Sequence, residues 1–220
     1  MDIWEAMRSR HSVRQFRSKP IEEDAAEAMR QAVATAAAAS GLKIVLCLDE
    51  PNAFQANKPS YGSFKNCANY IILAGPKGVD EAVGYFGEQL VLFAQQLGLN
   101  TCWVALTYEK SAPPIELSGG EKIYDLIALG YGASAGVAHR NKPLSRVAKL
   151  AKDDPEWYRQ GLEAAMLAPT AINQQRFRIE RVGERGVRAK ALLGPCSRTD
   201  LGIVKYHFEL GAGKENFDWL

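Results

Sequence analysis

The sequence predicts an α+β fold, and three observations lead to this class. Stretches with apolar residues at helical spacing alternate with short apolar runs that are rich in β-branched residues. The 220 residues, of which 47% are hydrophobic, suffice for one compact domain or for two half-domains that share a core. The order helix, strand, strand, helix also occurs twice, which favours two related half-domains, 1–150 and 151–220.

The first half is expected to begin with a short amphipathic helix, 1–10, whose basic end suits the negative end of the helix dipole. Pro20 then opens a longer helix, with acidic residues in its first turn and Gly41 at its end. A long apolar helix should run from Val79 to Gly98. The expected strands are 43–50, 69–76, 101–106 and 122–132, with a loop at 51–66 and an exposed basic connection at 139–150.

The second half begins near Asp153 and repeats much of this order. Its first helix should break at Pro169, and a second helix is expected at 200–213. Strands are expected at 176–183, 187–194 and 216–220. If the repeat is a true duplication, two half-sheets lie about a pseudo-twofold axis and share one functional site.

Charge and cysteine content exclude several functional classes. The formal net charge is only +2, which argues against a general nucleic-acid binder. The four cysteines form no C-x-x-C pair, and the three in apolar runs predict buried free thiols in a reducing compartment. We find no signal-peptide pattern and no apolar run of about 18 residues. The sequence therefore predicts a cytoplasmic protein that neither spans a membrane nor binds nucleic acid.

Basic residues nevertheless cluster near the start of the chain, in "RSRHSVRQF". Arg10, Ser12 and Arg14 alternate, so in an extended segment they project to the same side. Two guanidinium groups with a hydroxyl between them suit a phosphate or another anionic group. Arg140 and Lys142 form a second alternating basic pair.

Four segments resemble those of the FMN-dependent nitroreductase family. "RHSVRQF" is similar to the family's R-x-S-x-R-x-F signature, and "APTAINQQRF" to its A-P-S-x-x-N-x-Q-P-W segment. "LGLNTCWV" and "IALGYGASAGVAHRNKPL" resemble the end of its central helix and its closing strand with a basic tail. In ordinary members, which are homodimers, the A-P-S-x-x-N segment follows the first long helix, whereas here it lies at 168–173. The chain thus resembles the variant "putative TM nitroreductase" subgroup, in which the second half would take the place of a partner subunit.

The resemblance implies a nitroreductase-like fold over 1–220, with a central, mostly antiparallel sheet flanked by helices. It implies that NADH or NADPH delivers hydride to bound FMN, which reduces a small organic acceptor such as a nitroaromatic or a quinone. The protein would be a monomeric pseudo-dimer or a homodimer. The implied FMN-binding residues are Arg10, His11, Ser12, Arg14, Arg140, Lys142, Pro169, Thr170, Ala171 and Asn173. No catalytic side chain and no metal ligand is expected, because the cofactor supplies the chemistry.

Some alternatives and departures stay open. A flavin carrier or sensor without reductase turnover would keep the same phosphate residues, and a nucleic-acid module would use the basic segment alone. "QQRF" lacks the family's Pro after Gln, and "CWVAL" lacks the Pro-x-Glu-Gly that many members place against the flavin. A main-chain amide at Val104 or Ala105, and the loop at Tyr61 to Phe64, are further flavin contacts that the resemblance leaves undecided. His207 is expected to be a packed helix residue.

Overall fold

A computed structural model describes residues 1–54 and 63–220 of the chain. They form two compact units. The first contains Met1, Ser9–Val79 and Gln89–Ala138, and the second contains Asp2–Arg8, Asp80–Glu88 and His139–Leu220. The helices and the antiparallel sheet confirm the predicted α+β class. Within the described residues, no helix combines the length and the apolar character needed to span a membrane.

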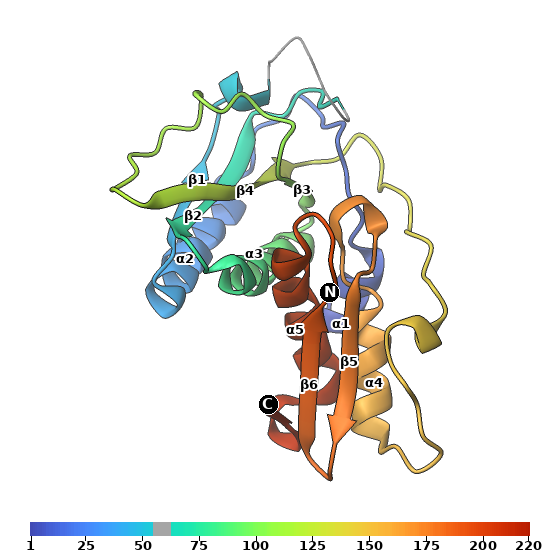
Figure 1. Cartoon of the computed structure of the whole chain (residues 1–220). Helices are drawn as coiled ribbons and strands as arrows, with labels where there is room; N and C mark the ends of the chain where they lie inside the picture. Colours follow the sequence, from blue (N-terminus) through green and yellow to red (C-terminus); the bar gives the residue numbers. More distant parts are fainter. Residues whose placement is uncertain (55–62) are drawn as a thin grey trace. The chain divides into compact units, whose positions relative to one another are not determined.

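The first unit is built on a four-stranded antiparallel sheet (Figure 1). Its strands are β1 (Lys43–Cys47), β2 (Asn69–Pro76), β3 (Asn100–Val104) and β4 (Glu121–Gly130), in the order β1-β2-β4-β3. Strands β2 and β4 occupy the centre of the sheet, and most of their side chains are buried. This burial explains why both sequences are almost continuously apolar rather than alternating.

Helix α2 (Glu23–Ser40) packs beside β1 and shows how local sequence signals set its ends. Glu23 and Asp24 lie in the first turn, where negative charge is favourable. Gly41 ends the helix with a left-handed φ of 69°, and its amide donates a hydrogen bond to the Ala37 carbonyl. The helix therefore begins three residues after Pro20 and ends where the sequence predicts.

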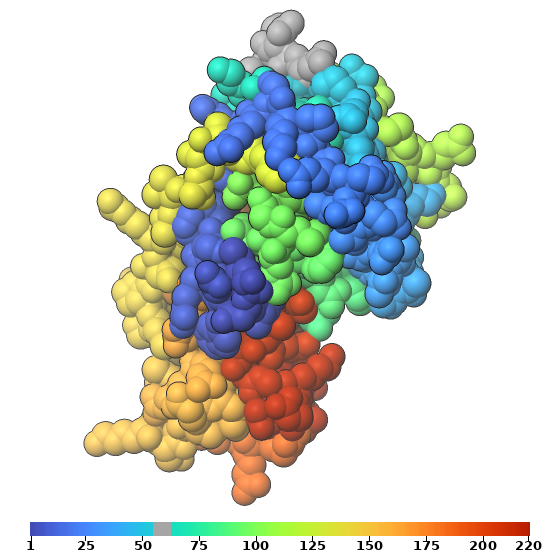
Figure 2. Space-filling model, turned by 180° about the vertical axis from the view of Figure 1, so that it is seen from behind, coloured from blue at the N-terminus to red at the C-terminus, as the bar shows by residue number. Residues whose placement is uncertain are grey.

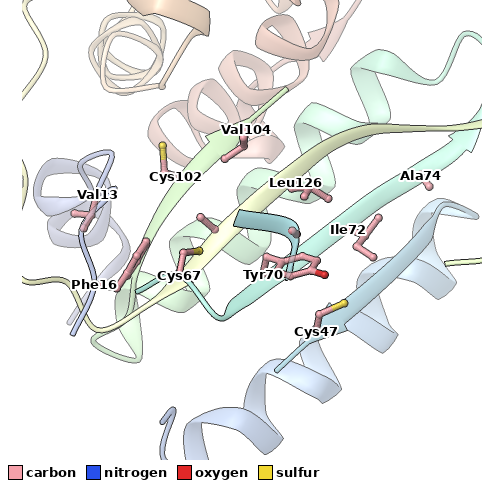
Figure 3. Close-up of a cluster of buried hydrophobic side chains, with 12 residues drawn as sticks. Val13, Phe16, Cys47, Cys67, Tyr70, Ile72, Ala74, Cys102, Val104 and Leu126 are labelled. Carbon is pink, nitrogen blue, oxygen red and sulfur yellow. The ribbon is translucent and has the colours of Figure 1, made fainter. Parts of the chain in front are cut away.

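The core of the first unit extends from the sheet to the N-terminal basic segment (Figure 3). Val13 and Phe16 are buried in the same cluster as Tyr70 and Leu126 of the central strands. Two neighbours in the sequence of Val13, namely Ser12 and Arg14, are exposed. Burial of Val13 and Phe16 thus anchors a segment whose polar side chains remain accessible.

The second unit contains a smaller sheet covered by two helices (Figure 1). Strands β5 (Phe177–Val182) and β6 (Gly186–Ala191) are antiparallel, and β7 (Asp218–Trp219) adds to β6 in parallel. Helices α4 (Glu156–Ala165) and α5 (Ser197–Ala212) pack side by side. The short helix α1 (Ile3–Ser9) is seen at the surface in dark blue in Figure 2, and Arg8 forms an exposed ion pair with Glu163 of α4.

Helices α3 (Asp80–Gln96) and α5 approach each other so closely that only glycine fits at two positions. A Cβ atom at Gly84 would lie 1.9 Å from the Thr199 carbonyl oxygen. A Cβ atom at Gly202 would lie 1.9 Å from the Glu81 carbonyl oxygen. Real Cβ atoms do not come so near to backbone atoms, so the helices can pack at this distance only because each has a glycine at the contact.

A buried polar pair lies near this helix crossing. Nε2 of His207 is 2.9 Å from Oε1 of Glu88, and both side chains are fully buried. Nδ1 of His207 lies 3.2 Å from the Ala164 carbonyl oxygen. A carbonyl oxygen can only accept, so Nδ1 carries a hydrogen, and a further hydrogen is shared between Nε2 and the carboxyl group. His207 is therefore a packed helix residue, as the sequence predicts.

The predicted exposed connection at 139–150 is wrong at Val147 and Ala148, which are both buried. Ala148 forms a parallel bridge with Ile179 of β5, and the Ile179 amide donates to the Val147 carbonyl at 2.8 Å. This pairing adds a short strand-like segment to the edge of the small sheet. The predicted burial of three cysteines is confirmed, because Cys47, Cys67 and Cys102 are buried free thiols, whereas Cys196 is exposed.

Candidate functional site

The basic segment near the N-terminus is extended and held by backbone hydrogen bonds within the first unit. The Val13 amide donates to the Thr101 carbonyl of β3 at 2.9 Å. Phe16 and Lys65 are similarly joined, since the Phe16 amide donates to the Lys65 carbonyl at 2.9 Å. The Arg17 amide donates to the Tyr131 carbonyl at 2.8 Å. The segment is therefore fixed against the ends of strands rather than free in solvent.

Arg10, Ser12 and Arg14 all influence the pKa of one buried thiol, that of Cys102. Burial raises the pKa of Cys102, whereas the charge of Arg14, a hydrogen bond from Ser12 and the charge of Arg10 oppose that rise. All three residues of the alternating set thus influence the same thiol, and their common placement on one side of the segment stays a prediction. The Arg10 side chain is nearly buried, at 3% exposure, whereas Ser12 and Arg14 are exposed.

A glycine turn after β4 lies against this segment. Gly136 has a φ of 77°, and a Cβ atom there would come within 2.8 Å of the His11 Cβ. Earlier in the turn, the Gly132 amide donates to the Asn100 side-chain oxygen at 2.9 Å. Glycine is thus required where the turn passes closest to the motif.

This arrangement suits a phosphate-bearing cofactor such as FMN. Two guanidinium groups supply charge-assisted hydrogen bonds, and the hydroxyl between them supplies a neutral one. The glycine at position 136 lets the turn lie close against the segment that carries these groups. The residues of the first unit therefore fit the group that the sequence resemblance implies.

The second unit brings together the other predicted site residues. Nδ2 of Asn173 donates to the Arg140 carbonyl at 2.9 Å, and the Lys142 amide donates to Oε1 of Gln175 at 2.8 Å. The Lys142 ammonium also donates to the Gln174 carbonyl. The basic tail and the "APTAINQQ" segment thus form one hydrogen-bonded cluster. Within this cluster the Lys142 side chain is held by the backbone carbonyl of Gln174.

The "APTAINQQ" segment carries unusual backbone conformations. Ile172, Asn173 and Gln175 have φ values of 47°, 53° and 44°. A positive φ is costly for a β-branched residue such as Ile172, which is also exposed by 69%. Strain of this kind persists only where the surroundings determine it. Gln175 helps to fix the segment, because its backbone amide donates a hydrogen bond to Oγ1 of Thr170 at 3.0 Å. Gln175 is also the position after which the sequence lacks the family's proline.

Asp200 of α5 also holds this segment and is a residue that the sequence analysis missed. Its Oδ1 accepts a hydrogen bond from the Ala171 amide at 2.9 Å, and its Oδ2 accepts one from Nε2 of Gln174 at 2.7 Å. Burial raises the pKa of Asp200 to about 6, although the bonds from Gln174 and Ala171 act in the opposite direction. The sequence signal was an acidic residue beside an apolar helical run, which by itself indicates only a first helical turn.

The raised pKa of Asp200 predicts a specific pH dependence of stability. Folding disfavours the ionised form, so this contribution to stability is full below the unfolded pKa near 4 and is lost as pH rises through about 6. Lowering the pH from 7 to 5 should raise the free energy of unfolding of the wild type, relative to Asp200→Asn, by on the order of 1 kcal/mol. Urea unfolding of both proteins across this range measures the difference. Parallel pH profiles would show that the carboxyl pKa is not raised.

The remaining predicted contacts are placed as follows. Pro169 and Thr170 are half-buried at the start of the strained segment. Val104 is buried in the core of the first unit, where Figure 3 shows its side chain, and Ala105 follows β3. Tyr61 lies outside the described residues. Phe64 packs against Phe54, with ring centroids 4.7 Å apart.

Comparison with known proteins identifies the family and supports the fold. The family model described as "Putative TM nitroreductase" matches residues 2–212. A crystal structure of a "putative nitroreductase" from Thermotoga maritima is similar, with a TM-score of 0.67 and 23% identity, over 98% of this chain and 85% of that one. None of the curated proteins matches the sequence.

Other solved structures share the fold over part of the chain. A nitroreductase family protein from Clostridium difficile 630 has a TM-score of 0.52 and 16% identity, over 70% of this chain and 100% of that one. A structure described as a "Putative NADH dehydrogenase/NAD(P)H nitroreductase" from Bacteroides thetaiotaomicron has a TM-score of 0.51 and 19% identity, over 66% and 95%. The match of the family model over nearly the whole length is the decisive finding, and the chain belongs to the Putative TM nitroreductase family.

Proposed function

We propose that the protein is an FMN-dependent oxidoreductase that uses NADH or NADPH to reduce a small organic acceptor, such as a nitroaromatic or a quinone. Membership of the nitroreductase family supports an oxidoreductase activity. The observation that carries the cofactor assignment is that the segment with Arg10, Ser12 and Arg14 is held extended between β3 and the glycine turn. The electron donor and the acceptor rest on the family resemblance.

Each residue of the first unit has a defined role in this proposal. Arg10 and Ser12 bind the phosphate or the ribityl chain, since a guanidinium and a hydroxyl together satisfy several phosphate oxygens. Arg14 would lie near the pyrimidine edge of the flavin, where its positive charge would favour the reduced, anionic ring. FMN, when bound, supplies hydride and electron transfer. Val13 and Phe16 keep the segment rigid, because their side chains are buried in the core.

The residues of the second unit are assigned to the same cofactor by resemblance, and this assignment stays a prediction. Asn173→Ala tests it within the chain. The variant should bind FMN more weakly and keep the oligomeric state of the wild type. Because the Asn173 amide donates to the Arg140 carbonyl, a thermal unfolding measurement must accompany the binding measurement. Unchanged FMN affinity with unchanged stability would remove Asn173 from the site.

A spectroscopic experiment tests the function as a whole. The purified protein should be yellow and release FMN on denaturation. Under anaerobic conditions NADH or NADPH should bleach the bound flavin, and an added quinone or nitroaromatic should restore the colour. Bound flavin that neither nucleotide bleaches would favour a carrier or a sensor instead. A colourless protein that binds no added FMN would overturn the proposal.

Replacing Arg14 by alanine should weaken FMN binding by about tenfold or more, because a charge-assisted hydrogen bond contributes roughly 1.5–3 kcal/mol. Fluorescence titration of FMN measures the affinity. Arg17→Ala is the matched control, since Arg17 is an exposed arginine of the same segment that lies outside the alternating set. Equal losses in the two variants would indicate a general effect of charge rather than a contact by Arg14.

A further inference from the structure

Basic side chains gather on the solvent-facing side of the small sheet in the second unit. Arg178 of β5 and Lys190 of β6 lie directly opposite each other in the strand register. Both are exposed, whereas their neighbours Phe177 and Ile179 face the core. Like charges directly opposite each other on one face of a sheet repel and destabilise it. A pair of this kind needs a compensating feature.

Beside this pair lies a cavity of about 380 Å³, within the size range of small-molecule sites. Lys149 adds a third cation to its lining, from the segment that bridges to β5 through Ala148. Leu150, Ala151 and Ile179 supply apolar lining. The cavity thus combines a basic rim with an apolar wall.

The acidic residues of the lining have cationic neighbours of their own. Asp154 accepts from Nε of Arg181 at 2.8 Å and from the Ala151 amide at 2.7 Å. Glu180 lies directly opposite Arg188 in the register of β5 and β6. Among the described residues, no carboxylate forms an ion pair with Lys149, Arg178 or Lys190. Three positive charges therefore remain at the cavity without an anionic partner in the described part of the chain.

We propose that this cavity binds a small organic phosphate. The phosphate dianion would lie between Lys149, Arg178 and Lys190 and screen the repulsion across the strands. The organic part would contact Leu150 and Ala151, which are exposed, and the volume exceeds what a phosphate ion alone needs. This site is separate from the proposed FMN-binding residues, because none of them lines the cavity.

The test uses phenyl phosphate and inorganic phosphate as probes, with calorimetric titration of the full chain at low ionic strength. Phenyl phosphate should bind at least tenfold more tightly than inorganic phosphate. The double variant Arg178→Gln/Lys190→Gln should lose at least tenfold in affinity for phenyl phosphate. Arg198→Gln is the control, because Arg198 is an exposed arginine of the same unit that does not line the cavity. Its affinity should stay within twofold of the wild type.

A second measurement separates binding from folding. Removing the like-charge pair should leave the melting temperature unchanged or raise it. Phenyl phosphate should raise the melting temperature of the wild type and of the control, but not that of the double variant. FMN content should be equal in all three proteins, so failure here is distinct from failure of the proposed function. Absence of phenyl phosphate binding, or equal losses in the double variant and the control, would overturn the site. Equal affinity for the two probes would overturn the organic part of the ligand.

Discussion

Replacing Gly84 by alanine should destabilise the protein by about 3 kcal/mol or more, near the upper end of the range for added bulk in a packed core. The new Cβ would meet the Thr199 carbonyl oxygen at 1.9 Å, so helices α3 and α5 must separate. Backbone cannot rotate away as a flexible side chain can. Separation would also open contacts around His207, which is fully buried. Thermal and urea unfolding measure the loss.

Gly119→Ala is the control for this experiment. A Cβ atom at Gly119 would have nothing within 4 Å, and its φ lies outside the left-handed region. This variant should unfold within about 0.5 kcal/mol of the wild type, as ordinary surface substitutions do. Gly202→Ala should behave like Gly84→Ala, because a Cβ atom there meets the Glu81 carbonyl oxygen at the same distance of 1.9 Å. A wild-type stability for either helix variant would refute the close crossing.

The second large effect is expected at the buried pair of Glu88 and His207. Glu88→Leu leaves Nε2 of His207 buried without its carboxyl partner at 2.9 Å. Removing one member of a buried hydrogen-bonded pair leaves the other without a partner, which costs roughly 1–3 kcal/mol and more if that group is charged. The expected result is a fall of that size in the free energy of unfolding.

A double variant distinguishes this explanation from a simple loss of packing. Glu88→Leu/His207→Leu removes both polar groups together, so no buried donor remains without an acceptor at Nε2. It should be less destabilised than the sum of the two single variants, with an interaction energy of about 1 kcal/mol or more. Strictly additive losses would indicate that the two side chains act independently.

The sequence was sufficient for most elements of the fold, since their signals are local. Gly41 ends α2 because a left-handed residue is needed there, and the apolar run of β2 marks a central strand. By contrast, the burial of Val147 and Ala148 depends on pairing with Ile179, about thirty residues further along. The basic, proline-containing sequence of residues 139–150 contains no pattern that predicts this pairing. The need for glycine at positions 84 and 202 could not be predicted either, because each glycine makes room for the backbone of the other helix.

In the candidate site, too, features set by local spacing could be predicted, whereas features set by contacts between distant residues could not. The alternation of Arg10, Ser12 and Arg14 could be predicted, because in an extended segment the spacing alone determines the side on which they lie. The role of Asp200 could not, because its partners Ala171 and Gln174 come from another part of the chain. The placement of Arg178 directly opposite Lys190 could not be predicted either, since the register between two strands is not apparent from either strand alone.

The second unit is assembled from residues that emerge from the ribosome at very different times. Its first pieces are 2–8 and 80–88, and its last begins at His139. At about 5–20 residues per second, the 82 residues from His139 to Leu220 require roughly 4–16 s of synthesis. Through that interval Ala6, Met7 and Val83, which end fully buried, have no second-unit core to enter. The nascent chain thus carries early apolar surface that a chaperone could bind until residues 139–220 have been synthesised.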